Sequence, residues 1–302
     1  MKVTSRKGRA IMKLNEINIR DPFILPYEGK YYMYGSRVGV TPEYPTHWGK
    51  QHGFDVYISE DLENWSAPKA IFERGDDFWG QEEFWAPEVH LYRGKFYLFA
   101  TFNASGKCRG THILVCDQPD GTFIPVSPSP ATPADWDCLD GTRYVDSAGK
   151  PHIVFCHEWL QIGNGTVCEA ELSEDLTHPV SEPRLLWHAS DFAHVASVKK
   201  DRDAYVTDGP FLYRCKSGTL LCIWSSFNKN GYVELISRSD NGDINGNWTV
   251  DVSPLSAENG GHGMIFRDFA GKLYFTMHKP NKTTLERPVI LPLTEVDGSL
   301  TL

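Results

Sequence analysis

The sequence predicts an all-β fold, a five-bladed β-propeller, from three observations. One unit occurs five times: a polar residue, an apolar run, a Gly-centred turn and a second, aromatic-rich run. The residues that lead the five copies are 52 to 68 positions apart, a spacing typical of a radial array with one sheet per repeat. No stretch keeps a 3.6-residue apolar period for more than about two turns, so we expect little helix. The leading residues, which a propeller would bring to one axis, are Asp21, Glu88, Asp140, Asp208 and His262.

Each copy predicts the inner hairpin of one blade. The copies span residues 20–36, 85–101, 139–155, 207–227 and 261–278. Their turns are centred on Gly29, Gly94, Gly149, Gly218 and Gly271. Glycine suits such turns because it adopts a positive φ without steric cost.

More polar runs beyond the hairpins predict outer strands. They are bounded by Gly, Asn and Asp, and they lie at 54–59, 69–72, 112–116, 123–126, 232–237, 248–250, 289–293 and 300–302. We therefore expect four-stranded antiparallel blades in a single domain over residues 1–302, with 1–15 as a flexible N-terminal segment. Two inserts rich in proline and aromatic residues, 39–53 and 127–137, predict loops on the functional face.

Composition and charge exclude several classes of partner. Lys and Arg total 30 against 39 Asp and Glu, a net charge of −9 without a basic run, which argues against nucleic acid. The longest apolar stretches have the length of a strand, so we expect no membrane span. Residues 1–15 are basic but lack an apolar signal core, and the seven cysteines contain no Cys-x-x-Cys pair. These features predict a cytoplasmic protein with buried free thiols.

Carboxylates at equivalent positions of several blades suggest glycosidic chemistry. Hydrolysis of a glycosidic bond uses one carboxylic acid to protonate the leaving oxygen and one carboxylate to activate water or attack directly. A third carboxylate nearby raises the pKa of the acid. Asp21, Asp140 and Asp208 open three separate blades and could converge in this way. Each alone has a simpler explanation, since Asp before Pro or Gly is common where a strand begins.

The motifs in order resemble glycoside hydrolase family 43 over nearly the whole chain. They are Arg20-Asp21-Pro22-Phe23, Trp85-Ala86-Pro87-Glu88, Leu139-Asp140-Gly141-Thr142, Thr207-Asp208-Gly209-Pro210 and Gly260-Gly261-His262-Gly263-Met264. The resemblance implies that Asp21 is the general base and that Asp140 tunes the pKa and orientation of the acid. It also implies that the acid lies at position 208.

The acid position departs from the pattern of that family, because Asp208 stands where the family has Glu. The carboxyl of an Asp lies about 1.5 Å nearer the backbone, and such a displacement can cost on the order of 100-fold in rate. Glu158 is the best alternative acid, unless it is a surface Glu at a strand end.

Other residues are candidates for binding substrate or metal. Phe23, Trp85 and Trp159 could stack on sugar faces, although core packing explains at least one of them equally well. Glu88 and Glu158 could line the pocket.

Arg287 could reach a sugar hydroxyl or could pair with Glu286 at the surface. For His262 the resemblance implies an axial histidine that helps to hold a structural calcium ion, mostly through water. A polar plug of the channel is the other interpretation, because calcium prefers oxygen ligands. We expect no required cofactor.

The sequence thus predicts an inverting glycoside hydrolase that needs no nucleic-acid or membrane partner. The resemblance points to terminal α-L-arabinofuranosyl or β-D-xylosyl residues of oligosaccharides derived from plant polysaccharides. Two alternatives stay open: a carbohydrate-binding propeller that has lost turnover, and an exo-glycosidase acting on galactosyl residues.

Overall fold

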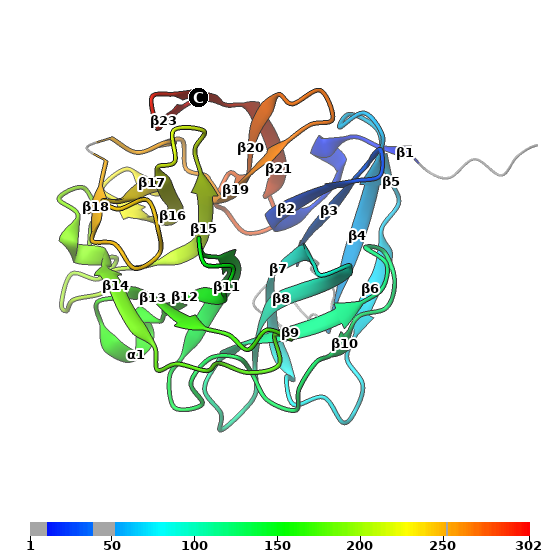
Figure 1. Cartoon of the computed structure of the whole chain (residues 1–302), viewed down its shortest axis with the longest axis horizontal. Helices are drawn as coiled ribbons and strands as arrows, with labels where there is room; N and C mark the ends of the chain where they lie inside the picture. Colours follow the sequence, from blue (N-terminus) through cyan, green and yellow to red (C-terminus); the bar gives the residue numbers. More distant parts are fainter. Residues whose placement is uncertain (1–10, 39–51, 252) are drawn as a thin grey trace, which may run out of the picture.

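A computed structural model describes residues 11–38, 52–251 and 253–302. Its antiparallel sheets stand around one axis as a five-bladed β-propeller (Figure 1), so the predicted fold class is confirmed. Most of the first insert, residues 39–51, and most of the N-terminal segment lie outside the described residues. The part of that segment that is described, from residue 11 onward, is ordered as strand β1 (Ile11–Met12) and a 3-10 turn at Leu14–Glu16.

In each blade the first strand of the inner hairpin is the innermost, and the strands that follow it in the chain lead outward. Blade one is β2 (Ile19–Tyr27), β3 (Lys30–Arg37) and β4 (Gly53–Ser59), edged by β5 (Trp65–Ser66), β6 (Lys69–Glu73) and β1. Blade two is β7 (Glu82–Tyr92), β8 (Lys95–Asn103), β9 (Gly110–Cys116) and β10 (Ile124–Pro125). Blade three is β11 (Cys138–Val145), β12 (Pro151–His157), β13 (Thr166–Glu171) and β14 (Arg184–His188). Blade four is β15 (Asp208–Arg214), β16 (Leu220–Asn228), β17 (Gly231–Ser239) and β18 (Trp248–Val250).

Blade five departs from the four-stranded expectation. It has three strands, β19 (Gly261–Arg267), β20 (Leu273–Lys279) and β21 (Arg287–Pro292), and a separate hairpin follows, β22 (Thr294–Val296) with β23 (Ser299–Thr301). Glu295 on β22 accepts hydrogen bonds from the Tyr213 hydroxyl and the Lys216 backbone N–H of blade four. These bonds draw the C-terminal hairpin toward the neighbouring blade, so residues 299–301 do not extend blade five.

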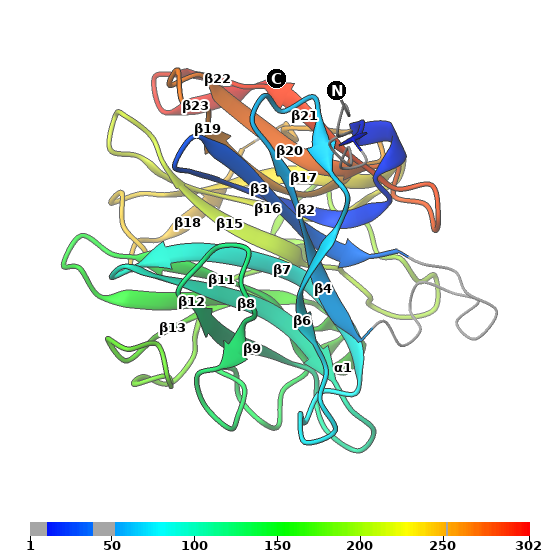
Figure 2. The ribbon, with the colours of Figure 1, turned by 90° about the vertical axis from the view of Figure 1, so that its right-hand side faces the viewer.

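The inner hairpins turn where the sequence predicts. The five turn glycines all have positive φ, between 78° and 91°: Gly29, Gly94, Gly149, Gly218 and Gly271. Figure 2 shows these long hairpins from the side, with β2, β3 and β4 of blade one crossing the face of the molecule.

Every innermost strand is kinked where its register with the second strand shifts, and β7 has two such shifts, of which the one between Trp85 and Glu88 corresponds to the single shift of the other blades. The residue with positive φ at this kink, between 46° and 56°, is Asp21, Ala86, Asp140, Gly209 or His262. The predicted equivalence of five leading residues is therefore wrong in two blades. Glu88 lies two residues beyond the kink of its blade, and Asp208 lies one residue before it.

Hydrogen bonds between neighbouring blades hold these kinks in place. The backbone N–H groups of Ala86, Asp140 and His262 donate to hydroxyls on the second strand of the preceding blade, at 2.7–2.8 Å. The acceptors are Ser36, Thr101 and Ser225. The N–H of Asp21 donates in the same way to Nδ1 of His278, at 3.3 Å.

Blade three has Cys156 at the position of these acceptors, because Cys156 pairs with Leu139 as Ser36 pairs with Arg20. A thiol is a weak acceptor. The N–H of Gly209 instead donates to the Asp140 carboxylate, at 3.0 Å.

The N-terminal segment joins blade five to blade one. Strand β1 pairs with β5, the Arg287 side chain donates to the carbonyl of Asn15 at 2.9 Å, and the Asn18 amide donates to the carbonyl of Glu286 at 2.7 Å. Apolar side chains between the blades form the core, with Trp65, Phe54 and Phe84 fully buried on the side of blade one. All seven cysteines are free and five are buried, as expected.

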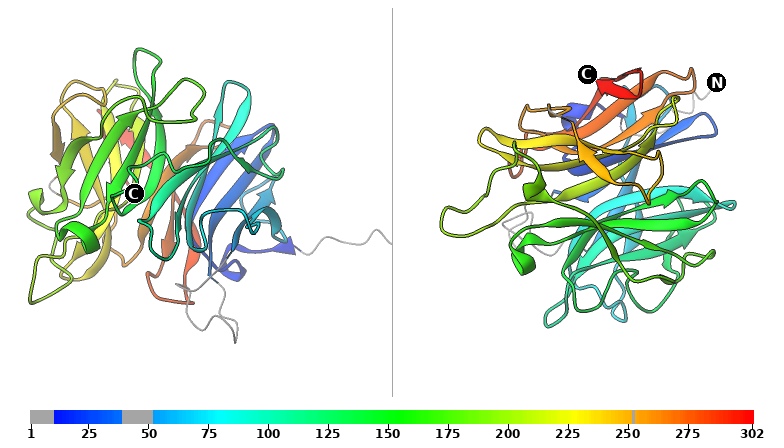
Figure 3. Two further views of the ribbon diagram at one scale, coloured as in Figure 1. Left: turned by 90° about the horizontal axis from the view of Figure 1, so that it is seen from below. Right: turned by 60° about the vertical axis from the view of Figure 1, so that its left-hand side comes forward.

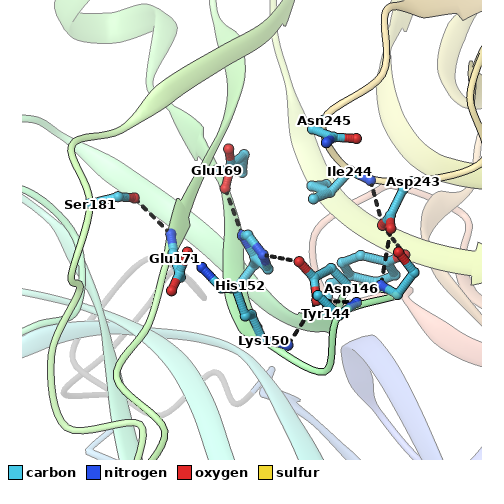
Figure 4. A network of polar contacts seen from close by, with 12 residues as sticks. Tyr144, Asp146, Lys150, His152, Glu169, Glu171, Ser181, Asp243, Ile244 and Asn245 are labelled. Carbon is cyan, nitrogen blue, oxygen red and sulfur yellow. Dashed lines mark hydrogen bonds and ion pairs between the residues drawn. The ribbon is translucent and has the colours of Figure 1, made fainter.

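A polar network joins blades three and four (Figure 4). His152 lies between Glu169, at 2.9 Å, and Asp146, at 3.4 Å. Asp243 of blade four accepts from the hydroxyl of Tyr144 and from the N–H of Ser147 in blade three. Within the three described stretches, no helix is both long and apolar enough to cross a bilayer.

Candidate active site

One pocket of about 530 Å³ collects most of the polar residues that the sequence singled out. Asp21, Asp140, Asp208, Glu158 and His262 all line it. They come from the inner strands of blades one, three, four and five and from the end of β12. The kinks position them, because a bulge in a strand redirects the side chains beside it.

Asp21 is held as a carboxylate. Its Oδ2 accepts from the Ser36 hydroxyl at 2.6 Å, and its Oδ1 lies 3.2 Å from Nδ1 of His262 and 3.9 Å from Nε of Arg20. Burial alone would raise the pKa of Asp21, but His262, His278 and Arg20 together outweigh it and hold the pKa well below its usual range. Asp21 therefore stays ionised and able to accept a proton.

The pKa of Asp140 is shifted in the opposite direction. Burial, followed by the negative charge of Asp21, raises the pKa of Asp140 to about 7, although the N–H of Gly209 donates to its Oδ2. Nδ1 of His262 lies 3.6 Å from the same oxygen, so one imidazole stands between the two carboxyl groups.

Asp208 is also placed to hold a proton. Burial, followed by the charge of Asp140, raises the pKa of Asp208 to about 7. The Tyr232 hydroxyl donates to its Oδ2 at 2.8 Å, which fixes the carboxyl against β17. Asp140 and Asp208 titrate as a coupled pair.

Glu158 occupies the pocket with both oxygens engaged. Its Oε2 accepts from Nη1 of Arg109 at 3.0 Å, and its Oε1 caps the short helix α1 (Trp159–Ile162) by accepting from the N–H of Leu160 at 3.4 Å. Burial and the charge of Asp208 raise the pKa of Glu158 to about 8 against the opposing effect of Arg109. A second carboxylate, Glu83, holds the same guanidinium at 2.7 Å.

His262 directs one ring nitrogen toward two aspartates. Its Nδ1 faces one oxygen each of Asp21 and Asp140, while calcium is bound by groups of six to eight oxygens. Over residues 11–38, 52–251 and 253–302, no cluster of three or more His, Cys, Asp or Glu side chains is arranged around a metal position. A calcium ion held through water stays a prediction of the resemblance.

Three predicted binding residues lie away from the pocket wall. Phe23 is buried in the core between blades, with its ring edge-on to His90 at 5.0 Å. Glu88 is buried beside the same histidine, at 2.9 Å. Arg287 donates to backbone carbonyls at the junction of blades five and one, and the Glu286 carboxylate instead pairs with Arg20 at 3.2 Å.

Both predicted tryptophans line the pocket, and each carries a cation on its ring. The guanidinium of Arg109 lies 4.8 Å from the ring centroid of Trp85, and that of Arg202 lies 5.8 Å from Trp159. The insert at 127–137 does not line the pocket. It supports the pocket from behind, because Trp136 stacks on His157 at 4.3 Å and the carbonyl of Asp137 accepts from the N–H of Glu158.

Sequence reasoning missed several residues of the wall, among them Arg20, Ser36, Arg109, Tyr232 and Asn281. One signal could have found Arg20. The residue just before the kink lines the pocket in four blades, as Arg20, Trp85, Leu139 and Asp208. Aligning the copies on the kink rather than on the acidic residues would have identified this position.

The pocket has two chemically different halves. The half from blades five, one and two is mainly polar, and besides Trp85 it includes Arg20, Ser36, Arg37, Glu83, Arg109 and Asn281. The half from blades three and four is mixed: its apolar side chains are Leu139, Trp159, Leu160, Val198, Val206 and Phe227, and its polar ones are Asp140, Glu158, Asp208 and Tyr232. The acidic groups lie where the two halves meet.

Comparison with known proteins agrees with this geometry. The sequence model of the family described as "Glycosyl hydrolases family 43" matches residues 15–298. The structure of an endo-arabinase from Bacteroides thetaiotaomicron superposes with a TM-score of 0.88 at 37% identity, over 97% of this chain and 99% of that one.

Two curated relatives match over shorter spans. A xylosidase/arabinosidase of Humicola insolens is 25% identical over 152 residues, 48% of this chain and 46% of its own length. An extracellular exo-α-(1→5)-L-arabinofuranosidase of Cellvibrio japonicus is 21% identical over 235 residues, 68% of this chain and 60% of its own. The chain thus spans about half the length of the curated relatives that it matches.

Proposed function

Since the chain belongs to glycosyl hydrolase family 43, we propose that it hydrolyses glycosidic bonds with inversion at the anomeric carbon. Asp21 is the general base, Asp208 the general acid, and Asp140 the group that keeps the acid protonated. One observation carries this proposal: three carboxyl groups line one pocket, and their surroundings push their pKa values apart. Such separation is how an enzyme obtains an acid and a base from the same kind of side chain.

The reaction then follows from the protonation states. Asp21 takes a proton from a water molecule as the water oxygen attacks the anomeric carbon. Asp208 gives its proton to the glycosidic oxygen, the bond from that oxygen to the anomeric carbon breaks, and the leaving group departs as an alcohol. Exchange of one proton with solvent returns Asp21 and Asp208 to their starting states.

Asp208 rather than Glu158 is the donor in this proposal. Glu158 is an ion-pair partner of Arg109 and the cap of α1, so both of its oxygens are already engaged. Asp208 has Tyr232 on Oδ2, so its Oδ1 carries the proton. Asp208 immediately precedes the left-handed Gly209 and lines the pocket despite its shorter side chain.

For the substrate, we propose terminal α-L-arabinofuranosyl or β-D-xylosyl residues of oligosaccharides. The names of the relatives support pentosyl groups, and the polar half of the pocket supplies donors and acceptors for sugar hydroxyls. Endo-action on arabinan is the second candidate, favoured by the 37% identical endo-arabinase. Analysis of the first products from linear arabinan distinguishes them, since exo-action releases only monosaccharide from the start.

A panel of nitrophenyl pentosides and galactosides tests the activity itself, and proton NMR of the first product tests its stereochemistry. We expect a pentoside to be cleaved and the first product to have the anomeric configuration opposite to that of the substrate. Retention of configuration would contradict the role of Asp21 as a base acting through water. Sugar binding without any turnover would instead favour a carbohydrate-binding propeller.

A further inference from the structure

We propose that Glu234 is a positioning residue for the reaction: it holds the proton of the Ser225 hydroxyl and thereby fixes His262 between Asp21 and Asp140. This inference rests on the proposed function and deepens it. Glu234 lies on β17, is fully buried and is not part of the pocket wall, so it acts through its neighbours rather than on the substrate. The proton transfers described above leave this buried carboxyl group without a role.

Two hydrogen bonds connect Glu234 to the backbone of His262. The Ser225 hydroxyl donates to Oε2 of Glu234 at 2.5 Å, and its oxygen accepts from the N–H of His262 at 2.7 Å. A hydroxyl has a single proton, and its lone pairs are its only acceptors. Ser225 can therefore hold the N–H of His262 in this way only while its own proton points elsewhere, and Glu234 is the group that receives it.

Strands β16 and β17 carry this pair against the kink of blade five. Ser225 and Glu234 face each other across the two strands, and both strands contact β19 (yellow strands beside orange ones in Figure 3). At the kink, Nδ1 of His262 lies 3.2 Å from Oδ1 of Asp21 and 3.6 Å from Oδ2 of Asp140. A displacement of the His262 backbone therefore moves the imidazole relative to both carboxyl groups.

The equivalent corner of blade two shows that the fold itself does not need a carboxyl group here. Thr101 accepts from the N–H of Asp140 at 2.8 Å, as Ser225 accepts from the kink of blade five. The residue opposite Thr101 on the third strand is Thr111, whereas the residue opposite Ser225 is Glu234. Both Thr111 and Glu234 are fully buried. A neutral hydroxyl is thus sufficient to build this corner of a blade.

A buried carboxyl group is costly, which argues that Glu234 has a function. Burial raises the pKa of Glu234 to about 7, and the Ser225 hydroxyl, followed by the charge of His262, opposes that rise. Replacing a buried charged group by an apolar side chain of similar volume is often neutral or stabilising. Residues that break such a rule are typical of functional sites, where they support the side chains that act on the substrate.

Glu234→Leu and Glu234→Gln test the proposal as a pair. Leucine fills the volume but cannot accept the Ser225 proton, so we expect kcat on a nitrophenyl pentoside to fall about tenfold to 100-fold while KM stays within about twofold. Glutamine keeps an acceptor oxygen and should restore kcat to within about threefold of the unmodified protein. The free energy of unfolding in urea should be no lower in Glu234→Leu, because an apolar side chain replaces a buried carboxyl group.

Glu169→Leu is the matched control. Glu169 is a buried carboxyl group on the third strand of blade three, where it lies 2.9 Å from His152 and is not part of the pocket wall (Figure 4). Its loss should lower the free energy of unfolding and leave kcat unchanged. Should Glu234→Leu fail to fold, Glu234→Thr takes its place with the same expected loss of kcat, since Thr111 fills the equivalent position in blade two.

The imidazole nitrogen NMR signals of His262 separate this inference from the proposed function, because they need no turnover. Their absence in His262→Gln assigns them. Signals that move in Glu234→Leu, return in Glu234→Gln and stay in place in Glu169→Leu support the inference even if the assigned chemistry fails. Signals that stay in place in Glu234→Leu would overturn it even if hydrolysis is confirmed. With hydrolysis confirmed, a kcat that Glu234→Leu does not change, or that Glu234→Gln does not restore, would likewise overturn it, because Glu234 would then only pack between the blades.

Discussion

At the scale of single residues, the state of each carboxyl group follows from its neighbours. Asp21 has the side chains of Arg20, His262, His278 and Ser36 within 4 Å, whereas the pKa of Asp140 is raised by burial and by the charge of Asp21. Cationic and donor neighbours keep a buried carboxyl ionised, and burial beside another carboxylate raises its pKa. The division of labour between base and acid therefore comes from placement, since all three residues are aspartates.

Asp21→Asn should lower kcat by about 10²- to 10⁴-fold, the usual contribution of a general base. The amide keeps the size of the carboxyl but cannot take a proton from water. Calorimetric titration with the reaction product should give an affinity within about threefold of the unmodified protein. A variant that keeps most of its kcat would show that Asp21 is structural.

Asp140→Asn should move the alkaline limb of the pH–rate profile to lower pH, by about one unit. Activity needs Asp208 protonated, so it is full below the pKa of about 7 and falls as the pH rises through that value. Removing the negative charge of Asp140 lowers the pKa of Asp208, and the fall then begins earlier. The profile of kcat/KM on a nitrophenyl pentoside measures this, and an unchanged alkaline limb would contradict the role of Asp140.

At the scale of the element, the kink in each inner strand explains both what the sequence predicted and what it missed. Hairpins and turn glycines could be predicted because periodicity and local φ preference are properties of the chain itself. The kink could not be predicted, because it depends on hydrogen bonds with the preceding blade. Alignment of the acidic residues placed Glu88 and Asp208 at the kink position, which the structure gives to Ala86 and Gly209, although Asp208 does line the pocket.

Gly209→Ala tests the kink of blade four. A Cβ at this position would lie 2.6 Å from the ring of His262, and the residue has φ near 52°. Asp21 and Asp140 show that other residues adopt this φ, so contact with His262 is what demands glycine. We expect a loss of at least about 2 kcal/mol in the free energy of unfolding, together with lower activity.

Gly149→Ala is the control for that measurement. Its φ is also positive, at 82°, but nothing lies within 4 Å of the added Cβ. It should cost about 1 kcal/mol and leave kcat unchanged. Equal losses of stability in the two variants would mean that the His262 ring moves aside at little cost. The close approach of Gly209 to His262 would then not be what requires glycine.

At the scale of the whole molecule, closure of the propeller explains why one predicted binding residue lies outside the site. Residues 14–18 come just before the innermost strand of blade one. They pack against blade five through the hydrogen bonds of Arg287 and Asn18. A ring of blades needs such a junction wherever the first and last units meet. Sequence motifs identify the residues of each blade, but they do not show which of these residues join blade five to blade one.

Arg287→Ala should therefore lower stability and spare catalysis. Loss of its hydrogen bonds to the carbonyls of Asn15 and Glu286 should reduce the free energy of unfolding by about 1–2 kcal/mol, as measured in urea. KM on a pentoside should stay within about twofold. A large rise in KM at unchanged stability would instead show that Arg287 contributes to substrate binding.

The central claim is that Asp208 delivers the proton, and the most direct test is the dependence of rate on the leaving group. Aryl pentosides with good and poor leaving groups, together with a pentosyl oligosaccharide, are to be compared in Asp208→Asn and Glu158→Gln. We expect Asp208→Asn to lose about 10²- to 10⁴-fold on the oligosaccharide and far less on a dinitrophenyl pentoside, which departs without full protonation. Glu158→Gln should show no such dependence on the leaving group. If Asp208→Asn instead cleaves the oligosaccharide normally while Glu158→Gln is inactive on it and active on the dinitrophenyl pentoside, the acid is Glu158.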